Sequence, residues 1–369
     1  NDRWFKTKQL AEELKIDELI ALRRELHQYP ELSGKERETA ERVKSFIQQF
    51  HPDHILENIG GTGLAAIFDG QEEGPTVLFR SDLDALPIDE INNFEYKSKH
   101  DGIGHKCGHD GHMTILSGLA RAISLERPKR GRAVLLFQPS EENGEGAEKV
   151  LNDPKFKLIE PDYVYALHNL PGYPEGSIIT NDTIFASASK GMIIKLYGKT
   201  SHAGEPENGL SPAIAMANLV KQLTYLPDRE PFKGFALVTV IHARLGEIAF
   251  GTTPGYAEIM ATLRSHTNED MELLTQKAGQ YVEMATKENG LKFEISWTEE
   301  FLAAENNKEA VNVIKMAAKE ADLKLIERQE PFRWSEDFSH FTIKYPGALF
   351  GLGSEQPSLH YHNQDYDFP

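Results

Sequence analysis

The sequence has little cysteine and lacks long apolar stretches. Only one of its 369 residues is a cysteine, Cys107, so the chain cannot form an internal disulfide bond. This composition is typical of a reducing compartment, and we expect a cytoplasmic protein, although a start at Asn1 rather than Met leaves room for a missing leader. No apolar run approaches the roughly 20 residues that a membrane-spanning helix needs, so we expect no membrane partner.

The chain also lacks an excess of positive charge. Its 40 Lys and Arg residues face 57 Asp and Glu residues, which gives a formal net charge of -17. Nucleic-acid-binding surfaces are normally basic, so we expect no nucleic-acid partner. Two enzyme motifs are missing as well. There is no G-x-S-x-G elbow of a serine hydrolase, and the glycine spacing before Gly198-Lys199-Thr200 does not fit a phosphate-binding P-loop.

Hydrophobic periodicity predicts alternating strands and helices at both ends of the chain. Apolar strands are expected at 64–68, 76–79, 133–137, 163–167 and 348–352, and helices at 36–49, from about 110 onward and at 310–321. This order is typical of an α/β fold whose largely parallel sheet is flanked by helices. A β-α-β-β-α-β pattern in the middle of the chain is typical of a ferredoxin-like α+β unit. We therefore predict a discontinuous domain of residues 1–187 and 300–369, interrupted by an insert at 188–299.

Three of the predicted strands run directly into polar clusters. These clusters are Ser81 to Asp84, Pro139 to Glu142, and His168-Asn169. In open α/β sheets, ligands bind beyond the carboxyl ends of the strands. We therefore expect the three clusters to form a single site.

The segment from Gly104 to His112 carries the strongest local signal, with three histidines, a cysteine and an aspartate. Cys107 and His109 lie on either side of a glycine, so both can turn toward one point. His109 and His112 are three residues apart at a helix start, so at most one of them need face that point. Imidazole, thiolate and carboxylate ligands suit zinc, manganese, cobalt or nickel better than calcium or magnesium. A structural zinc site is not expected, because paired C-x-x-C motifs are missing.

Two adjacent carboxylates, Glu141 and Glu142, follow a predicted strand. An isolated Glu-Glu pair is often only a surface feature, but this position favours a functional role. One carboxylate can bind metal while its neighbour acts as a general base toward water. His168 alone would more often be structural, and the pair His360 and His362 is ambiguous alone.

Taken in order, these motifs resemble peptidase family M20, the aminoacylase-like dinuclear metallopeptidases. The nearest resemblance is to the amidohydrolases that cleave N-acyl amino acids, and it covers nearly the whole chain. The segments that carry it are 26–33, 80–87, 105–112, 138–142 with 146–147, 166–169, 201–203, 335–338 and 362–368.

The resemblance implies a site for two divalent ions, with zinc, manganese, cobalt and nickel as candidates, and Glu141 as general base. His362 is preferred to His360 because the family's ligand is separated by three residues from an aromatic-Asp-Phe motif. The ligands implied are Cys107, His109, Glu142, His168 and His362.

The insert resembles the family's lid domain, which often mediates dimerisation, so a homodimer through the insert is expected. His202 resembles a histidine that helps to hold the substrate carbonyl or the developing oxyanion. Gly251 stands where the family usually has a substrate-binding asparagine, which leaves Arg264 as a candidate for the substrate carboxylate.

The expected activity is metal-dependent hydrolysis of the amide bond of a small N-acyl amino acid. Two alternatives remain open. A dipeptidase or small-peptide exopeptidase would use the same chemistry on a different acyl group. A non-catalytic metal-binding or ligand-binding homologue would need no Glu141.

Overall fold

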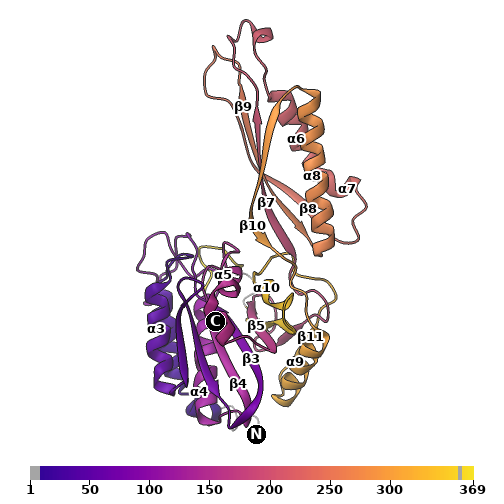
Figure 1. Ribbon diagram of the computed structural model, residues 1–369. Helices are drawn as coiled ribbons and strands as arrows, with labels where there is room; N and C mark the ends of the chain where they lie inside the picture. Colours follow the sequence, from indigo (N-terminus) through magenta and orange to yellow (C-terminus); the bar gives the residue numbers. More distant parts are fainter. Residues whose placement is uncertain (1–8, 356–359) are drawn as a thin grey trace. The chain divides into compact units, whose positions relative to one another are not determined.

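A computed structural model describes residues 9–355 and 360–369, and the chain divides into two compact units. Unit 1 contains the chain up to Phe185 together with Glu305–Glu330 and Asp337–Pro369. Unit 2 contains Ala186–Ala304 and Pro331–Glu336. Each unit has its own sheet (Figure 1). Within the described ranges, no helix is both long and apolar enough to cross a membrane.

Unit 1 is built on an eight-stranded sheet. Four neighbouring strands, β4, β3, β5 and β12, run parallel to one another, whereas β1–β2, β2–β4 and β12–β6 are antiparallel. This confirms the predicted α/β class with a largely parallel sheet. In spatial order the strands are β1 (His54–Ile59), β2 (Gly63–Asp69), β4 (Arg130–Gln138), β3 (Glu72–Asp82), β5 (Tyr163–Leu170), β12 (Gly347–Gly353), β6 (Ile178–Thr180) and β11 (Leu325–Glu327).

Helices flank the unit 1 sheet because its central strands are apolar on both faces. Four helices cover one face of the sheet. Met113 and Leu135 belong to the main hydrophobic core cluster on this face. Phe79 packs against this cluster and also against a second one, which includes residues of α9 (Lys308–Glu320). Leu78 and Val134 are fully buried on the opposite face, where two short helices lie against β4 and β12. The four helices are α2 (Ile16–Gln28), α3 (Arg37–Ile47), α4 (His109–Leu125) and α9 (Lys308–Glu320), and the two short ones are α5 (Gly146–Asn152) and α10 (Ser339–Thr342).

Three strands of unit 1 were not predicted. β1 is a half-exposed edge strand with the mixed sequence HILENI, and β6 and β11 have only three residues each. None of them shows the continuous apolar run of a buried strand. The helix predicted over 36–49 ends earlier, since α3 stops at Ile47 and a 3-10 turn follows over Gln48–Phe50.

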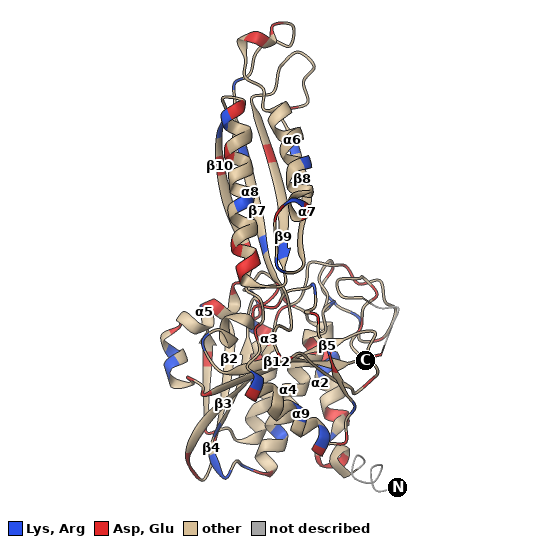
Figure 2. Cartoon of the chain, turned by 90° about the vertical axis from the view of Figure 1, so that its right-hand side faces the viewer, with Lys and Arg blue, Asp and Glu red and all other residues tan. Residues whose placement is uncertain are grey.

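Unit 2 has a four-stranded antiparallel sheet in the order β10-β7-β9-β8. Side chains of β9 alternate between half-buried and buried, and Ile259 and Leu263 pack under the helices. Acidic and basic residues are interspersed along α8 (Figure 2). In chain order the elements are β7 (Ala188–Tyr197), α6 (Ala213–Thr224), the short α7 (Leu226–Arg229), β8 (Ala236–Leu245), β9 (Tyr256–Ser265), α8 (Asn268–Glu288) and β10 (Lys292–Phe301), which is the ferredoxin-like order.

Candidate metal centre

The polar clusters after β3, β4 and β5 meet at one edge of the unit 1 sheet, as the sequence predicts. The three strands are parallel neighbours, with Asp82 opposite Gln138 and Arg80 opposite Ala166. Their carboxyl ends therefore lie together. His168 is itself part of β5, opposite Gly351 of β12.

One group of candidate ligands contains Cys107, His109 and His168, all buried, with their ligand atoms within 4.8 Å of one another. Cys107 Sγ lies 3.6 Å from His168 Nε2. Gly108 makes this approach possible: its φ of +89° is left-handed, and a Cβ there would lie 2.3 Å from the Asn169 side chain.

Two backbone carbonyls orient the histidines of this group. Nδ1 of His109 lies 2.8 Å from the carbonyl oxygen of Asp84, and Nδ1 of His168 lies 2.8 Å from that of Asn169. A carbonyl can only accept, so each Nδ1 carries a proton and donates it. Nε2 is then the atom of each ring that faces the cluster, which is the arrangement typical of metal-binding histidines.

A second group contains Cys107, Glu142 and His362. His362 Nε2 lies 3.6 Å from Glu142 Oε2. The backbone N–H of His362 donates to the carbonyl of Lys106 at 2.8 Å, and His362 has a left-handed φ of +63°. Because Cys107 belongs to both groups, a single sulfur atom connects them.

Glu141 and Glu142 also lie next to His109. Nε2 of His109 is 3.8 Å from Glu141 Oε2 and 3.6 Å from Glu142 Oε1. All six residues implied by the resemblance for unit 1 are therefore brought together by the fold. Their roles as ligands and base stay predictions.

His112 lies near the cluster but its ring is already engaged. Its Nδ1 donates to Asp82 Oδ1 at 2.9 Å, while its Nε2 accepts the backbone N–H of Asn169 at 3.0 Å. With its lone pair occupied in this way, His112 joins the end of β3 to β5 instead of offering a ligand atom. The geometry therefore favours His109 over His112 as the histidine that faces the cluster, and its role as a ligand stays a prediction.

The charges around His109 favour a cation at the centre. The buried Nε2 of His109 has no hydrogen-bond partner among the described residues. Burial opposes charge on this ring, but Asp82 and Asp84 outweigh it and raise the pKa of His109 well above its usual value. Burial and Glu142 raise the pKa of the Cys107 thiol, so a bound cation would have to displace its proton. Sulfur, imidazole and carboxylate donors together fit a zinc-like ion.

Two buried carboxylates hold the turn that carries Glu141: Asp84, from the first polar cluster, and Glu36, which the sequence did not single out. Glu36 Oε1 accepts the N–H of Ser140 at 2.9 Å. The two oxygens of Asp84 accept the N–H groups of Glu141 and Glu142 at 3.1 and 3.0 Å. Three successive amides are thus fixed, in a turn where Ser140 has a left-handed φ of +55°. Glu36 lies 104 positions before Ser140, so no local pattern could reveal the pairing.

The remaining candidates lie in unit 2. Nδ1 of His202 accepts the N–H of Gly204 at 3.0 Å, so the ring proton of its neutral form is on Nε2 and can be donated. Arg264 donates to the Arg333 carbonyl at 3.1 Å and to Ser335 Oγ at 3.2 Å. Among the described residues, no atom other than those of its chain neighbours lies within 4 Å of the Cβ position of Gly251, so packing does not require a glycine there.

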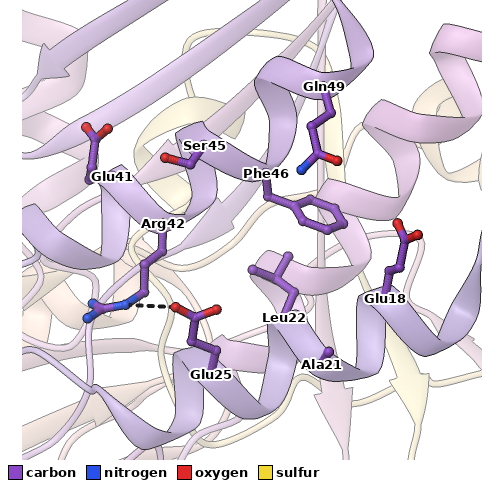
Figure 3. Close-up of a pocket in the computed structure, with 9 residues that line it drawn as sticks. All are labelled: Glu18, Ala21, Leu22, Glu25, Glu41, Arg42, Ser45, Phe46 and Gln49. Carbon is purple, nitrogen blue, oxygen red and sulfur yellow. Dashed lines mark ion pairs between the residues drawn. The ribbon is translucent and has the colours of Figure 1, made fainter.

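A separate pocket of about 540 Å³ lies between α2 and α3. Figure 3 shows Arg42 of α3 paired with Glu25 of α2, at 3.4 Å between Nε and Oε1. Its lining contains none of the candidate ligands, the base or the substrate-binding residues. We therefore place the functional site at the sheet edge and not in this pocket.

The chain is similar to several characterised proteins. It is 33% identical to N-acetyl-L-cysteine deacetylase of Bacillus subtilis, over 92% of this chain and 80% of that protein. It is 32% identical to N-acetyldiaminopimelate deacetylase of Lactobacillus acidophilus, over 94% and 91%. A dinuclear metal-binding peptidase of the M20 family from Bacillus subtilis has a similar structure, with a TM-score of 0.81 and 27% identity over 95% of this chain and 92% of the other.

Fold and relatives together define a metallohydrolase of the aminoacylase type. The sequence profile of peptidase family M20/M25/M40 matches residues 78–369, which is well over half of the chain. The protein therefore belongs to this peptidase family, and the resemblance inferred from the motifs is confirmed.

Proposed function

We propose that this protein is a metal-dependent amidohydrolase that cleaves the amide bond of N-acyl amino acids. The observation that carries the proposal is the convergence of a thiol, three histidines and two glutamates at one sheet edge. The deacetylase relatives support an acetylated amino acid as substrate. The five ligands would be Cys107, His109, Glu142, His168 and His362.

The centre would hold two divalent ions, with zinc, manganese, cobalt or nickel as candidates. Such ions, when bound, acidify water and polarise the carbonyl of a substrate. The shared position of Cys107 in both ligand groups supports two ions rather than one.

Glu141 would carry the proton in the reaction. It is buried, and its backbone is fixed by Asp84. Its carboxylate accepts a proton from water as the water oxygen adds to the acyl carbon. The same proton is then given to the amide nitrogen as the C–N bond breaks, which releases the carboxylic acid and the free amine. The presence of Glu141 argues against a purely metal-binding homologue.

Unit 2 would act as the lid that contacts substrate. His202 Nε2–H is a suitable donor to the oxyanion, and Arg264 is the candidate for the substrate carboxylate. His202 would reach the substrate either by closure of unit 2 over its own site or from a partner subunit. A homodimer through unit 2 is supported by β8, an edge strand with mostly exposed side chains. The cytoplasmic location stays a prediction.

A substrate screen tests the proposal. The purified chain, loaded in turn with each candidate metal, is incubated with N-acetyl amino acids, N-benzoyl amino acids and dipeptides, and the released amine is measured. We expect N-acyl amino acids to be hydrolysed, with activity lost on chelation and restored by metal. Preference for dipeptides would identify a peptidase instead. Two tightly bound ions without any turnover would identify a non-catalytic homologue.

A further inference from the structure

Six charged side chains form a buried array beside the candidate metal centre. The side chains of His27, Glu90, Lys106 and Asp110 are at most 1% exposed, and those of the other two are 10% and 18% exposed. Positive and negative groups alternate along the array. In order, its members are Asp367, Arg23, Asp110, His27, Glu90 and Lys106, and we call them the ionic ring.

The first half of the ionic ring joins residues 367–368 to α4. The carboxylate of Asp367 pairs with the guanidinium of Arg23, which also donates to the Phe368 carbonyl at 2.9 Å. Arg23 Nε lies 3.0 Å from Asp110 Oδ2. The same oxygen lies 2.8 Å from His27 Nδ1.

The second half of the ionic ring joins His27 to Tyr366, the residue before Asp367. His27 Nε2 lies 2.9 Å from Glu90 Oε1, which accepts a hydrogen bond of 2.5 Å from Lys106 Nζ. Lys106 Nζ also donates to the backbone carbonyl of Tyr366 at 2.8 Å. The array therefore starts at Asp367, and its last member, Lys106, contacts the neighbouring residue Tyr366, so both ends of the array meet at residues 366–367.

His27 acts as a cation within the ionic ring. Each of its ring nitrogens faces a carboxylate, which only accepts, so both nitrogens carry protons. Burial opposes this charge, but Asp110 and Glu90 outweigh it and raise the pKa of His27 to about 9. Three cations then balance three anions. Removing one partner of such a buried array leaves an uncompensated charge, which is strongly unfavourable.

The ionic ring fixes the closing segment 360–369, which carries His362 and no other proposed ligand. Lys106 contacts this segment twice, because its carbonyl accepts the N–H of His362 and its ammonium binds the Tyr366 carbonyl. Phe368 lies so close to Gly111 of α4 that a Cβ at Gly111 would be 2.3 Å from its ring. The segment has no helix or strand of its own, so these contacts, together with the hydrogen bonds from Tyr361 and Tyr366 to Asn169, hold it in position.

We propose that the ionic ring is a positioning device for His362, and that it completes the metal site formed by Cys107, Glu142 and His362. This inference rests on the proposed metal centre. His109 and His168 are oriented by the carbonyls of Asp84 and Asn169, which do not belong to the ring. Asp367 pairs with Arg23 at the end of the ring away from Cys107, so its replacement should weaken mainly the site that contains His362 and largely spare the site formed by Cys107, His109 and His168.

Substitutions at the two ends of the ring, Lys106→Met and Asp367→Asn, test this. Metal-free protein is titrated with cobalt or zinc by calorimetry, and cobalt absorption reports thiolate and imidazole coordination. We expect two ions in the wild-type chain. Each variant should keep one tight ion and bind the other roughly 10- to 100-fold more weakly, the usual cost of losing a group that orients a ligand. The control is Lys97→Met, an exposed lysine, which should bind both ions normally.

Asp367→Asn guards against misfolding of Lys106→Met, because Asp367 is the more exposed end of the ring. Asp367→Glu keeps the charge and should retain both ions. Two equally tight ions in folded Asp367→Asn, or equal weakening of both, would overturn the positioning role. A wild-type chain that binds no ion would overturn the metal centre itself, and that failure is visible before any variant is made.

Discussion

The two units hold their candidate functional residues in different ways. In unit 1, His109 and His168 are buried, and backbone carbonyls fix both rings. In unit 2, His202 lies on an exposed loop, and its ring accepts one backbone N–H. The fold thus orients both rings of the candidate metal site. The ring of His202, which we propose to contact substrate, is held by this one hydrogen bond, and its backbone forms a bridge with Thr252.

The two units also differ in how deeply they bury their charged side chains. Unit 1 buries the ionic ring, whereas in unit 2 the pair of Lys233 and Glu269 is typical of the surface, with side chains 70% and 68% exposed. Exposed pairs of this kind contribute little to stability. Charge changes should therefore be costly within the buried ionic ring of unit 1 and nearly silent on the unit 2 surface.

The largest effect is expected for Cys107→Ala. Cys107 belongs to both ligand groups, so its loss should lower the affinity for both ions and reduce turnover to the detection limit. Elemental analysis after gel filtration measures the metal content. Full occupancy of both sites in this variant would show that Cys107 is not a ligand, because the chain has no other thiol.

Glu141→Gln should separate chemistry from metal binding. The neutral amide cannot take a proton from water, so turnover should fall by about 10² to 10⁴-fold while both ions stay bound. The kinetics are measured on metal-replete protein, with Glu145→Gln as a control because Glu145 is exposed. Near-wild-type turnover in Glu141→Gln would remove this residue from the mechanism.

The sequence predicts the features of the fold and site that depend on neighbouring residues, and it misses the contacts between residues far apart in the chain. β3, β4 and β5 are apolar runs that end in polar residues, so the sequence indicates both the strands and the shared edge. The ligand set came from the family resemblance, and the roles of its members remain predictions, as do the domain boundaries and the lid. The engaged ring of His112, the contact of Glu36 with Ser140 and the ionic ring depend on residues far apart in the chain, so only the folded structure reveals them.

A smaller effect is expected in unit 2. His202→Ala removes the proposed oxyanion donor, and losing one such donor typically lowers kcat by about 10² to 10³-fold. Metal content should not change, since His202 belongs to none of the ligand groups. The matched control is His242→Ala, an exposed histidine on β8. An unchanged kcat in His202→Ala would mean that unit 2 does not supply the donor through this residue.

The smallest expected effect is a change with pH in the free energy of unfolding, caused by His27 of unit 1. The pKa of His27 is raised to about 9 from an ordinary value near 6.5. Its contribution to folding is therefore complete below about pH 6.5 and is lost as the pH rises through about 9, by at most about 3 kcal/mol. The charged or titratable groups around its ring are Arg23, Glu90, Tyr96, His105, Asp110 and Asp367.

Urea unfolding of metal-free protein at pH 6.5 and pH 9.5 measures this difference. His27→Gln should be less stable at pH 6.5 and should lose most of the pH dependence that the wild-type chain shows over this interval. If the variant keeps the full wild-type dependence, His27 is not the titrating group.

The central claim is that one thiolate and two sets of side chains at the sheet edge bind two ions. Crystals of zinc-loaded protein, measured at the zinc absorption edge, test it most directly through anomalous scattering. We predict two peaks per chain, both about 2.3 Å from Cys107 Sγ, with one about 2.1 Å from His109 and His168 and the other at a similar distance from Glu142 and His362. A single peak, or peaks away from Cys107, would contradict the account.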